Sequence, residues 1–262
     1  MPDAYTDHMT RRPRISDISY TPPSNSHQPR ALRLSEPELP GSYFASSRRI
    51  QMRTSRASIS SALYPPQSTL PASVSLAGID MKQPFPEHMH EKYDLVHVRM
   101  LVAAMLPSDW RTAVSNIARL LKPGGFLQWE ECDFLNAEWQ KCTPSASIEK
   151  TKYIGDAFRS ALRERFSHGW NTLPEHMRAA GLTSLVSDVA SSDKVPETRE
   201  KVTTGILGLV FTWARLVIER GAPESTFGDG LDNLEKAVHD EIKSGCYFKY
   251  NIHVACARKA LM

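Results

Sequence analysis

Several features that narrow the class of a protein are scarce or missing in this 262-residue sequence. Its four cysteines form no Cys-x-x-Cys pair, and no hydrophobic signal-peptide core follows Met1, so we expect reduced thiols in an intracellular, cytoplasmic protein. The longest apolar run, 205–218, is interrupted by Arg215 and is shorter than the roughly 20 residues that a membrane-spanning helix needs. The net charge of +3 is too small to indicate a nucleic acid or a membrane surface as a partner.

Lysine is absent from the first 72 residues, which hold 9 arginines, 13 serines and 10 of the 18 prolines. This segment carries a net charge of +4, whereas the rest of the chain carries −1. Its apolar residues are scattered without a helical or strand period, so the segment cannot bury enough surface to offset the entropy of ordering. We therefore expect 1–72 to be a disordered or irregular tail and 73–262 to be the folded domain.

Strand and helix signals alternate from residue 74 onward. The strands are expected at 74–79, 93–99, 126–130, 182–190 and 250–257. The helices are expected at 108–121, 148–166, 174–180, 197–219 and 232–243. Such alternation requires crossover connections and therefore predicts an α/β sandwich with a mostly parallel sheet.

The helix expected at 108–121 has the clearest signals. Ser108 is suited to its N-cap, and Asp109 is an acid in its first turn. One apolar face follows spacings of three and four: Trp110, Ala113, Val114, Ile117, Leu120 and Leu121. The Lys-Pro-Gly-Gly sequence at 122–125 should end the helix, since proline cannot continue it and glycine allows positive φ.

Polar residues follow two of the expected strands at the end where a parallel α/β sheet binds its ligand. Asp80 could accept hydrogen bonds from a ribose or an adenine amino group, or could cap the turn before Pro84. His97 and Arg99 lie two apart on one side of a strand. They could bind a carboxylate and shuttle a proton, or form a structural pair that holds a neighbouring loop.

An acidic run comprising Glu130, Glu131 and Asp133 follows the strand expected at 126–130. It could bind a metal or act as a base, but no second set of ligands with metal spacing accompanies it. We favour a solvated or helix-capping role and predict no metal site.

Three segments together resemble the class I S-adenosylmethionine-dependent methyltransferases, in particular a fungal group associated with secondary-metabolite pathways. They are Tyr-Asp-Leu-Val-His-Val-Arg-Met-Leu at 93–101, the helix with Trp110, Asn116 and 119–121, and Lys-Pro-Gly-Gly-Phe-Leu-Gln-Trp-Glu-Glu at 122–131. Asp80 with Pro-Phe-Pro at 84–86 is similar to the acid and loop that follow the family's third strand. The resemblance covers about residues 74–260.

The resemblance implies a Rossmann-like sheet in the order 3-2-1-4-5-7-6 whose last strand is antiparallel, with flanking helices. It implies S-adenosylmethionine as the cofactor, a small-molecule acceptor, and methyl transfer by proximity and orientation without a dedicated base. Asp80 and Met81 would then lie at the adenine side of the cofactor, and His97 and Arg99 near its methionine end. No catalytic residue is assigned.

Residues 191–245 are expected to form a helical lid over the acceptor side. The apolar face of this lid could be core or substrate pocket, and we favour core because one helical face in a single chain is usually needed for packing. That face comprises Ile206, Leu209, Val210, Trp213 and Val217.

The family's glycine-rich first turn is missing, because the only glycine before Gly78 is Gly41. Losing two or three hydrogen bonds to the cofactor would cost roughly 3–6 kcal/mol, or about 10²- to 10⁴-fold in affinity. We therefore expect an incomplete sheet lacking its first two strands, with cofactor binding that is weak or lost. Without those strands, either the strand at 74–79 moves or an N-terminal piece replaces the missing pairing. An edge left exposed would invite aggregation, or a partner protein or second copy that covers it.

Two origins would explain a truncated member of the family. The first 72 residues could be translated non-coding sequence in place of the true first exons, which we favour, or the chain could be a short paralogue without catalysis. The competing function is a catalytically inactive interaction or regulatory protein on the same fold.

Overall fold

The computed structural model of the protein describes residues 31–35, 49–53, 74–227 and 230–261. The strands in these ranges are β1 (Ala31–Ser35), β2 (Arg49–Arg53), β3 (Val74–Gly78), β4 (Tyr93–Arg99), β5 (Leu121–Lys141), β6 (Leu182–Ser191) and β7 (Cys246–Lys259). The α-helices are α1 (Asp109–Leu120), α2 (Glu149–Ala161), α3 (Arg163–Phe166), α4 (Leu173–Ala179), α5 (Arg199–Glu219) and α6 (Leu231–Lys243). Short 3-10 turns are η4 (Glu87–Met89), η5 (Val102–Ala104), η6 (Pro196–Thr198) and η7 (Glu224–Phe227).

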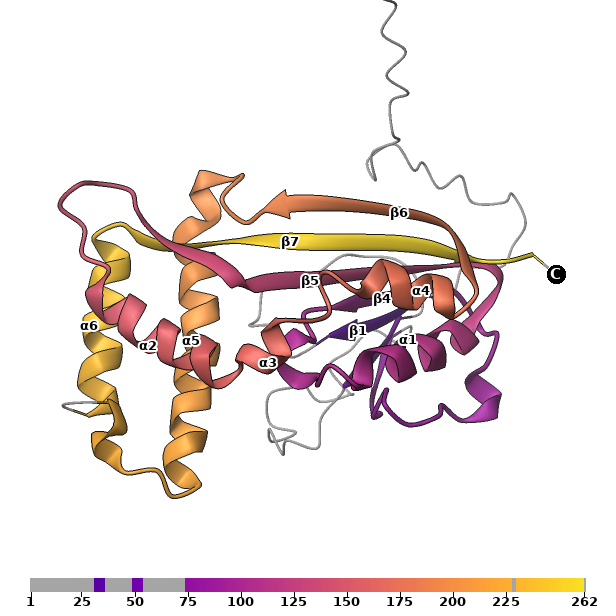
Figure 1. Cartoon of the computed structure of the whole chain (residues 1–262), viewed down its shortest axis with the longest axis horizontal. Coiled ribbons are helices and arrows are strands. Elements are labelled where there is room, and N and C mark those ends of the chain that lie inside the picture. The colour runs from indigo at the N-terminus through magenta and orange to yellow at the C-terminus, as the bar shows by residue number, and fades with distance from the viewer. Residues whose placement is uncertain (1–30, 36–48, 54–73, 228–229, 262) are drawn as a thin grey trace, which may run out of the picture.

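The seven strands form one sheet in the order β3-β2-β1-β4-β5-β7-β6. Figure 1 shows β6, β7, β5, β4 and β1 of this sheet in that order from top to bottom. The first five strands in the sheet order each pair in parallel with their neighbours among the five. β7 is antiparallel to both β5 and β6. This arrangement confirms the predicted α/β fold, the strand order that the resemblance implied, and the antiparallel last strand.

The prediction of an incomplete sheet is wrong, because β1 and β2 come from the segment expected to be a tail. β1 pairs along residues 31–35 with residues 95–99 of β4, so the edge of β4 that was expected to need a partner is occupied. β2 joins β1 to β3. The rest of the predicted tail, 1–30, 36–48 and 54–73, lies outside the described residues.

Both missed strands alternate in sequence over only five residues, Ala-Leu-Arg-Leu-Ser in β1 and Arg-Ile-Gln-Met-Arg in β2. An apolar residue at every second position is the signal of a strand. It was hidden because the composition of the surrounding segment is rich in proline, serine and arginine. The parallel pairing of these strands with distant strands is what identifies them.

Strand β4 and helix α1 form as their sequence patterns predict. Val96 and Val98 of β4 are fully buried, while His97 and Arg99 point to the other, half-buried face. All six residues of the predicted apolar face at 110–121 are buried. The expected cap is different, since Ser108 makes no side-chain cap and the Asp109 carboxylate accepts a hydrogen bond from the Leu106 N–H at 2.9 Å.

The Lys-Pro-Gly-Gly sequence forms an irregularity at the start of β5. Leu121 is opposite Tyr93 and Phe126 is opposite Leu95, so the register with β4 shifts across 122–125. Gly124 has a φ of +78°, as expected for a glycine that ends a helix and reverses the chain. The long strand β5 that follows carries the polar cluster described below.

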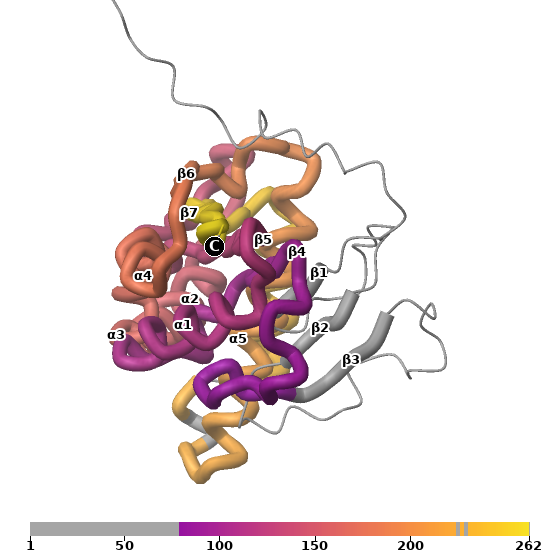
Figure 2. The backbone as a smooth tube through the Cα atoms, turned by 90° about the vertical axis from the view of Figure 1, so that its right-hand side faces the viewer, coloured from indigo at the N-terminus to yellow at the C-terminus, as the bar shows by residue number. Residues whose placement is uncertain are grey.

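Helices α1 and α4 lie on the same face of the sheet (Figure 2). The core beneath them joins β4, β5 and β7 to α1, and the rings of Trp110 and Trp129 meet there with centroids 5.7 Å apart. Both tryptophans are fully buried. Packing in this core holds the buried face of β4 and β5 in place.

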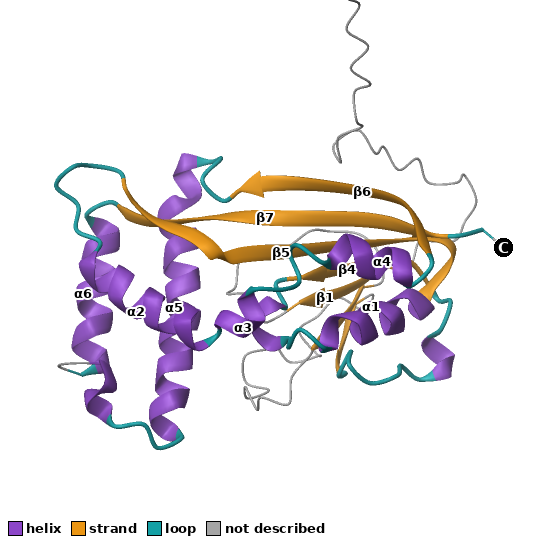
Figure 3. Cartoon of the chain, viewed as in Figure 1, coloured by secondary structure: helices purple, strands orange, loops and turns teal. Residues whose placement is uncertain are grey.

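Helices α2, α5 and α6 pack together against the last part of β5 and the first part of β7 (Figure 3). Their shared core, called here the helical layer, contains Ile154 of α2, Leu207, Val210, Phe211 and Ala214 of α5, Phe227 of η7, and Leu231, Leu234, Val238 and Ile242 of α6. The helices expected in the predicted lid at 191–245 are present as α5 and α6. Helix α2, which lies earlier in the sequence, is part of the same layer.

Helix α5 forms close to the helix expected at 197–219 and extends beyond the apolar run at 205–218. By length and hydropathy alone, the span Pro196–Glu219 is sufficient to cross a membrane, and it is one such helix among the described residues. A core helix meets the same criterion, and here Leu207, Val210 and Phe211 are buried against the helical layer. The helix is therefore weak evidence for a membrane segment.

Candidate functional site

The polar residues singled out in the sequence lie where β3 and β4 end. β4 is joined in parallel to β3 through β1 and β2, so the carboxyl ends of these strands lie along one edge of the sheet. Asp80 follows β3 after one residue, and Arg99 is the last residue of β4. This edge is the place where a parallel α/β sheet binds its ligands.

Asp80 is half-buried and shapes the turn after β3. Its Oδ1 accepts a hydrogen bond from the Lys82 N–H at 3.0 Å, and its carbonyl accepts one from the Gln83 N–H at 3.0 Å. The turn-capping role considered for Asp80 is therefore present. The second role considered for Asp80, binding a ligand, stays a prediction.

The side chain of Met81 is fully buried in the core under the sheet. A ligand at the strand ends could therefore meet only the backbone of this residue. Its carbonyl already accepts a hydrogen bond from Asn116 Nδ2 at 3.0 Å. Its cofactor role stays a prediction that is limited to the backbone.

His97 and Arg99 converge on one carboxylate of the neighbouring strand. His97 Nε2 is 2.9 Å from Glu130 Oε1, and Arg99 Nε is 3.5 Å from Glu130 Oε2. Gln128 Nε2 donates to the same Oε1 at 2.8 Å. The structural pairing considered for His97 and Arg99 is thus present, with a strand as their partner instead of a loop.

The electrostatics of this cluster favour the ionised form of Glu130. Burial of the carboxyl would raise its pKa, but the hydrogen bond and charge of His97, the hydrogen bond of Gln128 and the charge of Arg99 outweigh it and lower the pKa. The side chain is 21% exposed, so these interactions are only partly screened by solvent. The cluster is therefore a compact, charged group close to the strand ends.

The acidic run does not act as one group, because its carboxylates lie in different surroundings. Glu131 is fully buried and accepts hydrogen bonds from backbone N–H groups after β4. Asp133 accepts hydrogen bonds from the backbone and side-chain amides of Asn136 at 3.1 and 2.9 Å. Among the described residues, no group of three or more His, Cys, Asp or Glu side chains is arranged to hold a metal ion.

Two features of this edge were not predicted from the sequence. Asn116 is 7% exposed and bonds the loop after β3, and Met100 has a φ of +54° directly after β4. The signal for Asn116 was available, since it is a polar residue among the apolar positions of α1. The conformation of Met100 had no signal, because left-handed backbone is not expected of methionine.

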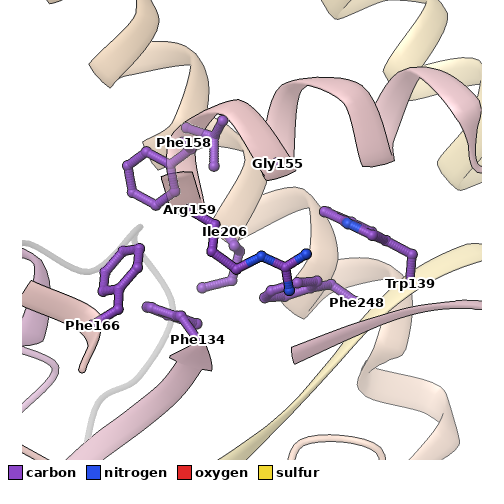
Figure 4. A pocket seen from close by; sticks show the side chains of 9 residues that line it. Phe134, Trp139, Gly155, Phe158, Arg159, Phe166, Ile206 and Phe248 are labelled. Carbon is purple, nitrogen blue, oxygen red and sulfur yellow. The ribbon is translucent and has the colours of Figure 1, made fainter. Parts of the chain in front are cut away.

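A small apolar cavity lies between the second half of β5 and the helical layer (Figure 4). It is lined by Phe134, Trp139, Gly155, Phe158, Arg159, Phe166, Ile206, Val210 and Phe248. Arg159 extends between the rings, donates to the Ala137 carbonyl at 2.8 Å and pairs with Asp156. The volume is about 20 Å³, which is room for about one water molecule.

The apolar face predicted for the lid is divided between core and surface. Ile206 and Val210 are buried and also line the cavity, while Leu209 is 38% exposed. Trp213 is partly buried against Phe158, with ring centroids 5.3 Å apart. Packing therefore accounts for most of this face, as we favoured.

The segment that would carry the family's glycine-rich turn follows β1. It comprises residues 36–48, which lie outside the described residues. Its sequence contains a single glycine, Gly41.

Comparison with known proteins gives relatives by sequence, although no protein-family model matches the chain. The methyltransferase grgD of Penicillium sp is 50% identical over 183 residues, which are 68% of this chain and 62% of grgD. The methyltransferase psoC of Aspergillus fumigatus is 24% identical over 179 residues, which are 66% of this chain and 63% of psoC. The chain thus spans less than two thirds of the length of these relatives.

Among solved structures, the chain is similar to Haemonchus contortus phosphoethanolamine N-methyltransferase 2 bound to S-adenosyl-L-methionine. The TM-score is 0.45 at 16% identity, over 90% of this chain and 50% of the other. Similarity at this level carries no argument about the site. The chain is thus similar in sequence to fungal methyltransferases, in agreement with the resemblance found in the sequence.

Proposed function

We propose that the protein binds S-adenosylmethionine and transfers its methyl group to a small molecule of fungal secondary metabolism. The observation that carries this proposal is the 50% identity to grgD over 183 residues. The strand order and the polar residues at the ends of β3 and β4 support it, since this edge is where such a sheet takes its ligand.

The residues at the sheet edge suit the parts of this donor. The Asp80 carboxylate, fixed by Lys82 N–H, is suited to accept hydrogen bonds from the adenine or ribose end, and Met81 contributes its backbone. Arg99, 29% exposed and held beside Glu130, is suited to pair with the donor's carboxylate. His97 contacts the same Glu130 carboxylate and so helps to hold it beside Arg99.

When bound, S-adenosylmethionine supplies an electrophilic methyl group. The contribution of the chain is to hold the donor and the acceptor in line, which can supply several kcal/mol of the barrier without a general base. The cavity of about 20 Å³ is far too small for a metabolite. We therefore place the acceptor at the sheet edge near Arg99, with the helical layer as its lid.

A second candidate is a catalytically inactive interaction or regulatory protein with this fold. The observation in its favour is the sequence after β1, where one glycine stands in place of a glycine-rich turn. Backbone N–H groups of such a turn hold the cofactor closely, so their loss weakens binding. An inactive protein of this kind would bind the cofactor more weakly than the enzyme does.

Calorimetric titration of the whole chain with S-adenosylmethionine and S-adenosylhomocysteine tests the proposal, with NAD as a control ligand. We expect dissociation constants in the micromolar range for the first two ligands and no binding of NAD. The Asp80→Asn variant keeps an oxygen for Lys82 N–H but loses the charge, so its affinity should fall about tenfold or more. Absence of binding at millimolar ligand would favour the inactive protein instead.

A further inference from the structure

The turn after β4 has a strained backbone that neighbouring groups hold in place. Met100 has a φ of +54°, a region that costs a non-glycine residue about 1–3 kcal/mol and persists only where its surroundings enforce it. Its N–H donates to the Glu130 carbonyl at 2.9 Å. The next two N–H groups, of Leu101 and Val102, donate to the Glu131 carboxylate at 2.9 and 3.0 Å.

Glu131 reaches this turn from β5 and is fully buried. Its Oε1 also accepts a hydrogen bond from Trp129 Nε1 at 2.7 Å. A buried carboxylate is stable only while donors surround it. The turn at 100–102 therefore cannot move away without leaving this charge unsatisfied, and the position of the turn is coupled to the sheet.

The loop after β3 is held in a similar way from α1. Asn116 is 7% exposed, and its Nδ2 donates to the carbonyls of Met81 and Gln83, both at 3.0 Å. An amide nitrogen has two hydrogens, and these two carbonyls use both. Because Gln83 N–H also bonds the Asp80 carbonyl, Asn116 fixes the turn that presents Asp80.

Both anchors lie behind the sheet edge. Their elements, α1 and β5, are joined through the contact of Trp110 with Trp129. Neither side chain is exposed enough to meet a ligand, so each can act only through the backbone that it holds. A site that is held by helices and strands is positioned more precisely than one that is held by loops alone.

We propose that Asn116 and Glu131 are positioning residues for the methyl donor, which set the loops after β3 and β4 from behind. The proposal rests on the proposed function, in which these two loops hold the donor. It predicts that loss of either anchor lowers donor affinity even though neither residue touches the donor. Their effect reaches the ligand through the turn at Asp80 and the turn at Met100.

The test compares the Asn116→Ala and Glu131→Gln variants with a matched control, Glu241→Gln. Glu241 is also buried, and it accepts backbone hydrogen bonds from Lys150 and Thr151 at 3.0 and 2.8 Å, but in the helical layer. Calorimetric titration with S-adenosylhomocysteine is done on whole chains that circular dichroism shows to be folded. We expect the dissociation constant to rise about fivefold or more in both test variants and to stay within about twofold in the control.

Hydrogen exchange adds a measurement at the turn itself. Glu131→Gln should speed exchange of the Leu101 and Val102 amides, and saturating S-adenosylhomocysteine should restore part of their protection. If Glu131→Gln does not fold, Trp129→Phe removes the indole N–H donor to Glu131 while leaving the carboxylate in place, although it also removes part of the ring that packs against Trp110. It should then raise the dissociation constant above that of the control.

The outcomes separate the two proposals. If the wild-type chain binds S-adenosylhomocysteine and the test variants bind it as tightly as the control does, the positioning role is wrong and the proposed function stands. If the wild-type chain does not bind at millimolar ligand, both proposals are overturned.

Discussion

The sheet edge and the helical layer each bury one carboxylate that accepts hydrogen bonds from backbone N–H groups. In the helical layer, Glu241 of α6 holds the first turn of α2 through Lys150 and Thr151. In the sheet, Glu131 of β5 holds the left-handed turn that follows β4. The same interaction thus docks one helix onto another in the first region and shapes a surface in the second.

The surroundings of the two carboxylates differ as well. Close to Glu131, the sheet edge has a charged cluster of His97, Arg99 and Glu130, and the turn at Asp80 lies along the same edge. The helical layer around Glu241 is mainly apolar and encloses a cavity no larger than a water molecule. Charged and apolar residues are therefore divided between the two regions.

Removing one large core ring from each region should have the largest effect. Trp129→Ala in the sheet and Phe211→Ala in the helical layer each remove a fully buried side chain and should lower the free energy of unfolding by about 3–5 kcal/mol. Urea unfolding measures this loss. Because the two cores are separate clusters, Phe211→Ala should speed hydrogen exchange in α5 and α6 more than in β4. Equal acceleration in both regions would show a single cooperative core.

Adding one methyl group should have opposite signs at two helical glycines. A Cβ at Gly155 of α2 would lie 2.2 Å from Trp139 Cζ2, so Gly155→Ala should destabilise the fold by about 1–3 kcal/mol. A Cβ at Gly208 of α5 meets nothing within 4 Å, so Gly208→Ala should stabilise it by up to about 1 kcal/mol. Thermal unfolding of both variants decides this, and a gain at Gly155 would mean that Trp139 moves freely.

Acid should weaken both regions through carboxylates whose pKa is lowered. The pKa of Glu130 and the pKa of Glu241 are each lowered because hydrogen bonds outweigh burial. Each group therefore adds stability at neutral pH that is lost as the pH falls below about 4.5 and through the lower folded pKa. Glu130→Gln and Glu241→Gln should each lower the free energy of unfolding by about 1–2 kcal/mol at pH 7. Each should also reduce the loss of stability at acid pH. Urea unfolding between pH 7 and 3 measures this. If either assignment is wrong, that variant loses as much stability at acid pH as the wild-type chain does.

Surface ion pairs should have the smallest effect in either region. Lys122 meets Asp94 at 2.9 Å beside β4, and Arg215 pairs with Glu235 between α5 and α6. The two cations are 42% and 44% exposed, so Lys122→Met and Arg215→Met should each change stability by less than about 1 kcal/mol. Chemical unfolding at low and high salt measures the change in stability of each variant. A larger loss would show that the ion pair concerned contributes substantially to the stability of the fold.

Much of the fold was predictable because its signals are local. The alternation in β4 and the apolar spacing of α1 each place a short segment correctly, and Gly124 has the positive φ expected after α1. β1 and β2 were missed because five alternating residues are a weak signal in a segment rich in proline and serine. Their identity depends on pairing with strands far away in the sequence.

The site was predictable in its residues more than in their partners. The rule that ligands bind at strand ends selected Asp80, His97 and Arg99. It did not predict that His97 and Arg99 share Glu130, since that contact joins residues about 30 positions apart across two strands. The adjacent Glu130 and Glu131 looked alike in sequence, yet the first is partly exposed and the second fully buried.

The sequence by itself determined the α/β class, the elements from β3 onward and the kinship with methyltransferases, because periodicity and motifs are properties of neighbouring residues. Only the tertiary structure decided that β1 and β2 complete the sheet and that Asn116 and Glu131 hold the loops after β3 and β4. These features arise from hydrogen bonds between distant segments. A local pattern can mark a short strand or a polar residue on an apolar face, but the partner of each bond is fixed by which groups burial brings together.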